Sequence, residues 1–144
     1  GEDSGILSGF LTEWINERES DEMQSLEYEY TALKRLFAHG DFSRLAVKCG
    51  GVFIDGRLCA FTLGSYCCEN GLGIIHIEKA FSSYKGLYQF VNREFLRRSM
   101  RAAVIVNRED DLGIAGLRQA KLSYHPDGFC RKYVVRSVPE CQAL

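Results

Sequence analysis

A row of polar and charged residues follows directly on a hydrophobic stretch in the second half of the chain. Residues 102–106 read Ala-Ala-Val-Ile-Val and predict a buried strand. The residues after it are Asn107, Arg108, Glu109, Asp110 and Asp111. Ligand sites of α/β proteins are built where strands end, and carboxylates this close would raise one another's pKa, which suits proton transfer. The alternative is that these acids cap the next helix and pair with Arg108 or Arg118.

The segment after this turn carries further groups that could bind or react. A short helix is predicted from about Gly113, with Arg118 and Lys121 three residues apart on its exposed face. Two cations so placed could hold a phosphate, and exposed salt bridges are the alternative. Tyr124 could donate a proton, or be a half-buried aromatic whose hydroxyl is bonded.

A second group of residues lies between a predicted strand and a predicted helix. Glu78 ends the strand, and Ser83, Lys85 and Gly86 follow near the start of the helix. A glycine at a helix N-terminus leaves backbone N–H groups exposed, and Lys85 adds a positive charge, which together suit a phosphate or pyrophosphate. Plain capping by the serines is the alternative.

Periodicity predicts the elements that position these groups. Residues 3–39 form two amphipathic helices with a stop at His39-Gly40. Asp55-Gly56 is a strong hairpin signal between two strands. The predicted strands are 45–54, 57–66, 72–78, 102–106 and one near 130–137, and a long helix runs from Ser82 to about Met100.

The order ααβββαβαβ predicts an α+β fold, with a mixed, mostly antiparallel sheet flanked by helices. Only strands 72–78 and 102–106 need be parallel, and their diverging ends would form a cleft. Glu78, Asp110 and Arg118 are expected to open into one pocket beside Gly86. At 144 residues, the chain is expected to be one domain, 1–144, with a helical part 3–39 and a sheet-containing part 44–137.

Composition excludes several classes of protein. Hydrophobic residues at 46% and charged residues at 26% fit a soluble globular protein, and no apolar run approaches the roughly 20 residues that span a bilayer. The net charge of −1 hides an asymmetry, since residues 1–30 hold nine acids and one base. The basic remainder suits an anionic partner such as a nucleotide cofactor, tRNA or an anionic lipid, although a solvated acidic surface explains the asymmetry equally well.

The cysteines and histidines predict no metal centre. Six cysteines form no CxxC pair and have no zinc-like spacing to histidine, and free thiols in a reducing cytoplasm are expected. Cys67-Cys68 has no positioned base in the sequence, which argues against a cysteine nucleophile. His76 alternates within an apolar strand, and this favours a core histidine over a catalytic one.

Several blocks of residues carry a resemblance to known families. Ser83-Tyr-Lys-Gly-Leu-Tyr88 and the tail Ala120-x-x-x-Tyr-x-x-x-Gly-Phe129, with the βββαβα order, look like the GNAT acyltransferase fold. More specifically, residues 45–135 resemble the C-terminal domain of bacterial phosphatidylglycerol lysyltransferases and related uncharacterised proteins. The residues that carry this are Ala60-Phe-Thr-Leu-Gly64, His76-Ile-Glu-Lys-Ala80, Tyr84-Lys-Gly-Leu-Tyr-Gln89, Asn107-Arg-Glu-Asp-Asp-Leu-Gly113 and Gly116-Leu-Arg-x-Ala-Lys-Leu-Ser-Tyr-His-Pro126.

The resemblance implies transfer of an acyl or aminoacyl group to an amine or hydroxyl, from an acyl-coenzyme A thioester or an aminoacyl-tRNA. Glu78 would be the base, with Glu109 and Asp110 behind it, and Tyr124 the proton donor. Further residues would bind the donor, namely Ser83, Lys85, Gly86, Tyr88 and Gln89. The acceptor would be bound by Asn107, Glu109, Arg118 and Lys121. No metal is implied.

Two other functions remain open. A non-catalytic module could keep the fold and bind an anionic ligand or a partner domain. Family members are tandem GNAT-like folds, so the chain would be mainly the second half, and an N-terminal GNAT-like half would be missing. A regulatory half that needs this partner would show an exposed apolar face on helix 5–17. The expected location is cytoplasmic, with peripheral membrane association as a variant.

Overall fold

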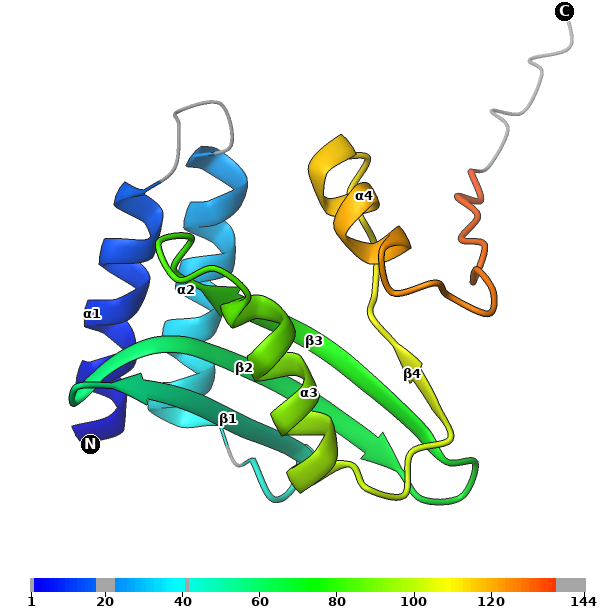
Figure 1. Cartoon of the computed structure of the whole chain (residues 1–144), viewed down its shortest axis with the longest axis horizontal. Coiled ribbons are helices and arrows are strands. Elements are labelled where there is room, and N and C mark those ends of the chain that lie inside the picture. The colour runs from blue at the N-terminus through cyan, green and yellow to red at the C-terminus, as the bar shows by residue number, and fades with distance from the viewer. Residues whose placement is uncertain (1, 18–22, 41, 137–144) are drawn as a thin grey trace, which may run out of the picture. The chain divides into compact units, whose positions relative to one another are not determined.

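The structure is a computed structural model that describes residues 2–17, 23–40 and 42–136. Its helices are α1 (Glu2–Asn16), α2 (Met23–His39), α3 (Leu87–Ser99) and α4 (Ala115–Leu122) (Figure 1). Its strands are β1 (Val47–Ile54), β2 (Arg57–Cys67), β3 (Leu72–Ala80) and β4 (Ile105–Asn107). The chain divides into two compact units, residues 1–109 and 110–144.

The first unit contains a four-stranded mixed sheet in the order β1-β2-β3-β4. β1, β2 and β3 form an antiparallel meander, and β4 runs parallel to β3. Asp55 and Gly56 have φ of 51° and 80°, both in the left-handed region that a tight hairpin turn requires. The predicted α+β fold and the single parallel pair are therefore confirmed.

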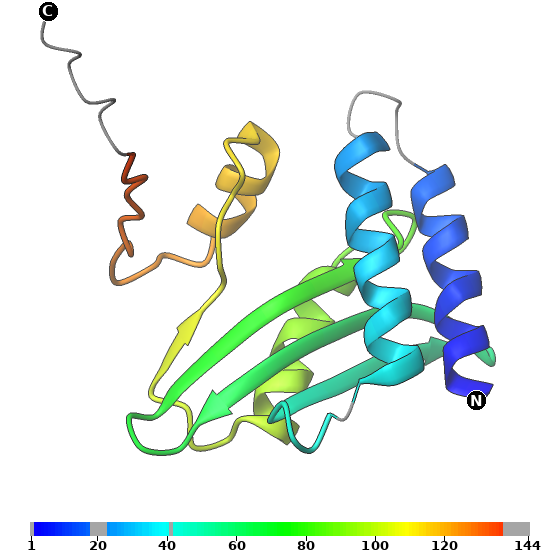
Figure 2. The same ribbon diagram turned by 180° about the vertical axis from the view of Figure 1, so that it is seen from behind.

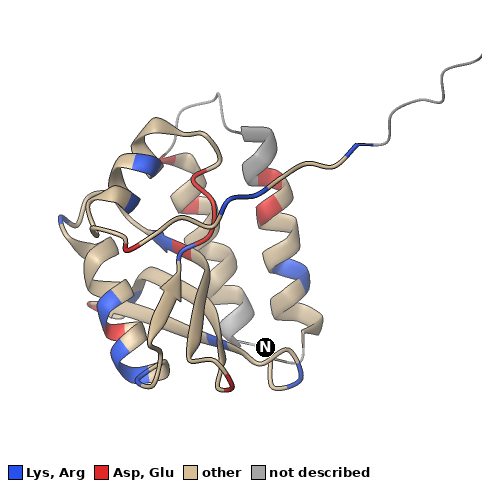
Figure 3. Ribbon diagram, turned by 90° about the vertical axis from the view of Figure 1, so that its right-hand side faces the viewer, with Lys and Arg blue, Asp and Glu red and all other residues tan. Residues whose placement is uncertain are grey.

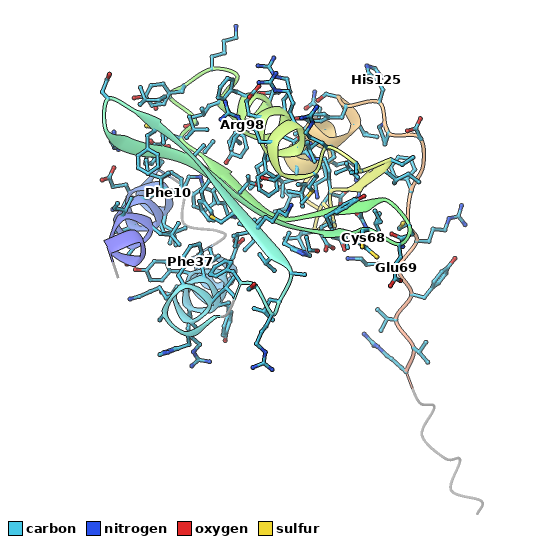
Figure 4. The ribbon with its side chains drawn as sticks, turned by 90° about the horizontal axis from the view of Figure 1, so that it is seen from below. Phe10, Phe37, Cys68, Glu69, Arg98 and His125 are labelled. Atoms are coloured by element: carbon cyan, nitrogen blue, oxygen red, sulfur yellow. The ribbon has the colours of Figure 1, made fainter. Side chains whose placement is uncertain are left out.

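α3 covers one face of the sheet, and α1 with α2 covers the other (Figures 2 and 4). Glycines on the α3 face let this helix approach closely. A Cβ on Gly64 would lie 2.6 Å from Met100 Cε and 3.0 Å from Phe95 Cε1, and a Cβ on Gly50 would lie 2.8 Å from Phe95 Cδ2. Phe95 and Met100 fill the space that these glycines leave, and form a small core with Ile75.

The larger core joins α1 and α2 to the sheet and also includes the first turns of α3. Phe10 of α1 packs edge-on to Phe61 of β2, with ring centroids 5.6 Å apart, and against Phe81 at 4.8 Å. Trp14 is 3% exposed and donates its indole N–H to the carbonyl oxygen of Ala80 at 3.1 Å. The apolar face of α1 is thus buried within this chain, contrary to the exposed face that a regulatory half would show.

Three predicted boundaries differ from the structure. α3 begins at Leu87 and not at Ser82, because residues 82–86 form turns in which the N–H of Leu87 bonds the carbonyl oxygen of Tyr84 at 3.1 Å. β4 spans only 105–107 and not 102–106. The predicted last strand near 130–137 does not form over the described residues 130–136, where no neighbouring strand pairs with it; residue 137 lies outside the described residues.

Candidate functional site

The site begins where β3 and β4 cease to pair. Their parallel ladder joins residues 72–74 to 105–107, after which β4 ends while β3 continues to Ala80. The next two residues of the chain, Arg108 and Glu109, bond side chains of β3 that lie on opposite faces of the sheet. Polar groups therefore gather beside the part of β3 that no described strand covers on this edge.

Glu78 lies at the centre of the group on the α3 face. Its Oε1 accepts a hydrogen bond from Arg108 Nη2 at 2.8 Å, and its Oε2 accepts one from Asn92 Nδ2 at 2.8 Å. The Glu78 side chain is 8% exposed and that of Arg108 is 21% exposed. A buried carboxylate with a donor on each oxygen and a paired guanidinium is electrostatically satisfied. The network ties β3, α3 and the end of β4 together, and the predicted role of Glu78 as a base stays a prediction.

A second chain of polar side chains lies on the opposite face. Ser65 Oγ is 2.9 Å from His76 Nε2, and His76 Nδ1 is 3.5 Å from Glu109 Oε1. His76 is exposed, so the expectation of a core histidine is wrong. Sequence reasoning missed Ser65, because its contact with His76 depends on the register of β2 against β3. The turn residues Asn70-Gly71, which join these strands, are a sequence signal that bears on this register.

The loop before α3 is the predicted phosphate-binding segment. Gly86 has φ of 82°, forms the N-cap of α3 and accepts the N–H of Phe90 at 2.9 Å. The glycine thus stands at the N-terminus of a 13-residue helix, as predicted, where backbone N–H groups point outward. Glu17, which directly follows α1, accepts hydrogen bonds from the backbone N–H and the Oγ of Ser82, and this holds the loop against the end of α1.

The other predicted donor-binding residues have different surroundings. Ser83, Lys85 and Gln89 are exposed. Tyr88 is half-buried and its hydroxyl accepts a hydrogen bond from the indole N–H of Trp14 at 3.4 Å. Tyr88 therefore helps to join α3 to α1, whereas the three exposed side chains are available to a ligand.

The charged residues of the second unit bond one another. Arg118 donates to both carboxylate oxygens of Asp111, from Nε at 2.6 Å and from Nη2 at 3.2 Å. These bonds, with one from the N–H of Gly113, lower the pKa of Asp111 to about 2. The expectation that the grouped acids raise one another's pKa is therefore wrong for Asp111, because the attraction of Arg118 exceeds the repulsion between carboxylates.

The remaining predicted residues of this unit also have local partners. Lys121 Nζ donates to the backbone carbonyl oxygen of Asp110 at 2.5 Å, and Asp110 Oδ2 lies 3.6 Å from Lys132 Nζ. Asp110 Oδ1 accepts the N–H of Leu112, and Tyr124 is 39% exposed.

In the first unit, Asn107 Oδ1 accepts the N–H of Glu109 at 2.8 Å, which shapes the turn after β4. The shared pocket of Glu78, Asp110 and Arg118 stays a prediction.

A cavity of about 340 Å³ lies at the C-terminal end of α3. It is lined by apolar Leu96, Met100, Ala103 and Val106 and by the cations Arg97 and Arg101.

Figure 3 shows that basic residues recur along α3. Glu94 is the acid that pairs with three of them, Arg93, Arg97 and Arg98, at 3.3 Å each. These bonds lower the pKa of Glu94, with Arg98 as the leading cause against the raising effect of burial.

Other kinds of site are not found in the described part of the chain. No group of three or more His, Cys, Asp or Glu residues is placed to hold a metal ion among residues 2–17, 23–40 and 42–136. The five described cysteines are free thiols, as expected, and Cys141 lies outside the described residues. Over the same residues, the helices are too short or too polar to cross a membrane.

Comparison with known proteins gives a consistent result. The model of the family described as "Phosphatidylglycerol lysyltransferase, C-terminal" matches residues 6–136. An uncharacterised protein of Mycoplasmoides gallisepticum is 28% identical over 137 residues, which cover 94% of this chain and 42% of that protein. The crystal structure of a conserved protein of unknown function from Bacteroides thetaiotaomicron is 32% identical with a TM-score of 0.71, and covers 88% of this chain and 42% of that one.

Two acetyltransferase structures share the fold at lower identity. A ribosomal-protein-alanine N-acetyltransferase from Brucella melitensis has a TM-score of 0.58 at 12% identity, and covers 94% of each chain. A possible acetyltransferase from Clostridium difficile has a TM-score of 0.54 at 10% identity, and covers 95% of this chain and 93% of that one. The chain thus has the fold of the GNAT acetyltransferases, and spans less than half the length of its nearer relatives named above.

Proposed function

The chain belongs to the phosphatidylglycerol lysyltransferase C-terminal family, and from this we propose that it transfers an acyl or aminoacyl group to an amine or hydroxyl acceptor. The donor would be an acyl-coenzyme A thioester or an aminoacyl-tRNA ester. Both donors carry phosphates as well as an activated carbonyl carbon. A site for either one therefore needs an anion-binding element beside a strand edge that can receive the carbonyl group.

The observation that carries the proposal is the early separation of β3 from β4. Pairing stops after Ile74 and Asn107, so no described strand covers residues 75–80 of β3 on this edge. Uncovered backbone N–H groups on a strand edge are donors for an extended ligand or for a developing oxyanion. The same strand leads through the loop at 81–86 to the N-terminus of α3, where an anion would bind.

The roles that we propose for individual residues follow from this arrangement. Lys85, the Gly86 loop, Ser83 and Gln89 would bind the donor phosphates, since these side chains are exposed around the start of α3. Glu78 would take the proton from the acceptor, which requires that Arg108 or Asn92 release one carboxylate oxygen when substrate binds. In the second unit, Arg118 and Lys121 would hold an acceptor phosphate, and Asp110 and Tyr124 would assist proton transfer.

Binding measurements on the isolated chain test this proposal. Isothermal titration with acetyl-coenzyme A and with aminoacyl-tRNA should detect saturable binding of at least one donor. Glu78→Gln should keep donor binding and lose transfer, because it removes the base and leaves the loop at 81–86 unchanged. Arg35→Ala, an exposed change on α2, is the matched control. Absence of binding by both donors to the folded wild-type chain would overturn the catalytic proposal.

A non-catalytic module is the second candidate, and one observation favours it. Both oxygens of Glu78 already accept hydrogen bonds from side chains that hold the fold together. If Glu78 serves only this purpose, donor binding would be retained without transfer to any amine or hydroxyl acceptor.

The relatives that this chain matches are more than twice as long as it. We therefore also propose that a further N-terminal domain completes the acceptor site.

A further inference from the structure

Ser65, His76 and Glu109 lie in contact in the order of a nucleophile, a base and an orienting acid. Ser65 Oγ lies 2.9 Å from His76 Nε2, and the other ring nitrogen, Nδ1, lies 3.5 Å from Glu109 Oε1. A hydroxyl on one imidazole nitrogen with a carboxylate on the other is the arrangement that activates a serine. The 3.5 Å contact is long for a hydrogen bond, and such contacts often shorten when substrate binds.

The three residues come from three different strand segments that the fold brings together. Ser65 lies on β2, His76 on β3, and Glu109 two residues after β4. The β2–β3 register shifts here, since Leu63 pairs with Ile77 and Gly64 with Ile75, which leaves His76 as the extra residue of a bulge. Bulges re-aim side chains and are frequent next to active sites. The bulge therefore supplies a structural reason why His76 reaches both Ser65 and Glu109.

This series lies on the other face of the sheet from Glu78. Gly64 faces α3, since a Cβ there would meet Phe95 and Met100, and side chains alternate along a strand, so Ser65 points to the opposite face. Glu78 bonds Asn92 of α3 and so belongs to the α3 face. The two polar groups are therefore separate sites, and the results expected for one do not depend on the other.

The series is also open to a ligand. Ser65 is half-buried, and the side chains of His76 and Glu109 are 36% and 40% exposed. A hydrogen-bonded group that only fastened β2 to β3 would need no such access. The Ser65 hydroxyl is half-buried and the imidazole of His76 beside it is accessible, so a small electrophile can reach the hydroxyl oxygen.

We propose that Ser65 is a nucleophile that accepts an acyl group from an activated ester or thioester. The Ser65 Oγ–C bond forms as the carbonyl carbon is attacked, and His76 Nε2 takes the hydroxyl proton. The bond from carbon to the leaving oxygen or sulfur then breaks, and His76 returns the proton to that atom. Glu109 accepts the Nδ1–H and stabilises the imidazolium between the two steps. Water or an amine repeats the sequence in reverse and frees Ser65.

Labelling with diisopropyl fluorophosphate tests the proposal. Its phosphorus forms a stable bond to an activated serine oxygen as fluoride leaves, and peptide mass analysis locates the adduct. We expect the adduct on Ser65 in the wild-type chain and its loss in Ser65→Ala. His76→Gln should slow labelling about 100-fold or more, because general base catalysis typically contributes 10²–10⁴-fold. Glu109→Gln should slow it by a smaller factor.

Controls keep the result interpretable. Ser123→Ala, directly after α4, removes a hydroxyl that donates to the carbonyl oxygen of Ala120, and should not alter the labelling of Ser65. Thermal unfolding of each variant shows that the chain is folded. A folded wild-type chain in which Ser65 stays unlabelled would overturn the proposal, and so would equal labelling rates in wild type and His76→Gln. Either result leaves donor binding at the α3 loop unaffected.

Discussion

Arg108 and Glu109 are consecutive residues whose side chains bond opposite faces of the same sheet. Arg108 Nη2 lies 2.8 Å from Glu78 Oε1 on the α3 face, and Glu109 Oε1 lies 3.5 Å from His76 Nδ1 on the other. Glu109 has φ of 57°, so the backbone turns directly after Arg108, and the bulge at His76 places that side chain on the face opposite Glu78. One short strand end, placed beside β3, therefore contributes to two chemically different groups.

The Glu78–Arg108 pair predicts a large loss of stability when its acid is removed. Glu78→Ala removes the ion pair of Arg108, which is 21% exposed, with Glu78 and the hydrogen bond of Asn92 Nδ2 to the Glu78 carboxylate. Breaking one partner of a buried pair costs about 3–5 kcal/mol, and the remaining exposure of Arg108 places this case near the lower value. Urea unfolding of Glu78→Ala and of Glu78→Ala/Arg108→Met measures the effect.

The double variant Glu78→Ala/Arg108→Met separates the cost of burying the Arg108 charge from the cost of losing the other contacts of Glu78. It should recover part of the stability, because the guanidinium that lost its pairing with Glu78 is gone. Glu13→Ala, which removes the exposed partner of Arg57, should cost less than about 1 kcal/mol. Equal losses in Glu78→Ala and Glu13→Ala would contradict the account of the network.

The close approach of α3 to the sheet predicts that Gly64→Ala is destabilising. Its Cβ would lie 2.6 Å from both Met100 Cε and the carbonyl oxygen of Ile74, and backbone cannot move as easily as the end of a methionine. Overpacking of this kind costs about 1–3 kcal/mol. Gly9→Ala is the matched control, since nothing lies within 4 Å of its Cβ and alanine favours the helix interior by about 0.5–1 kcal/mol. A neutral or stabilising Gly64→Ala would show that the helix is less closely packed.

The pair of Asp111 and Arg118 predicts a titration far below the ordinary range. The pKa of Asp111 is lowered to about 2, against an ordinary 3.8, so its interaction with Arg118 is complete above pH 3.8 and is lost as pH falls through about 2. An NMR titration of the Asp111 carboxyl carbon and of the Gly113 amide measures this midpoint. Arg118→Gln should raise the midpoint toward 3.8. A wild-type midpoint already near 3.8 would show that the ion pair does not persist in solution.

The loop before α3 predicts a specific effect of Lys85 on donor affinity. Lys85 is exposed beside the α3 N-terminus, so Lys85→Ala should weaken donor binding about 5-fold, corresponding to about 1 kcal/mol, without altering stability. The effect should shrink at high salt, because exposed charges are screened. Titration calorimetry at two ionic strengths measures it, with Arg35→Ala as control. An unchanged affinity in Lys85→Ala would remove Lys85 from the donor site.

The sequence predicted those parts of the fold that depend on local patterns. Asp55-Gly56 gave the first hairpin, and the glycine at position 86 gave the N-terminus of α3 within the correct loop. The start of the helix was placed too early because Ser82 looks like a cap in sequence. In the structure its hydroxyl instead bonds Glu17, directly after α1, a contact across 65 residues that local patterns do not contain.

The site was predicted less completely than the fold, for a related reason. Glu78, Asn107 and Glu109 were identified from strand ends, but the pairing of Glu78 with Asn92 requires the packing of α3 on the sheet. The contact of Ser65 with His76 requires a bulge whose position the alternation of residues does not reveal. For the acids after β4, the sequence left proton transfer and ion pairing open, and the structure shows ion pairing for Asp111.

The measurement that tests the central claim most directly is hydrogen–deuterium exchange of the wild-type chain with and without a saturating donor. The account predicts that acetyl-coenzyme A or aminoacyl-tRNA slows exchange of the amides in the loop at 81–86 and in the first turn of α3, where the donor phosphates would bind. Slower exchange in residues 75–80 of β3 should accompany it. Saturating donor that leaves the exchange of both segments unchanged would contradict the account.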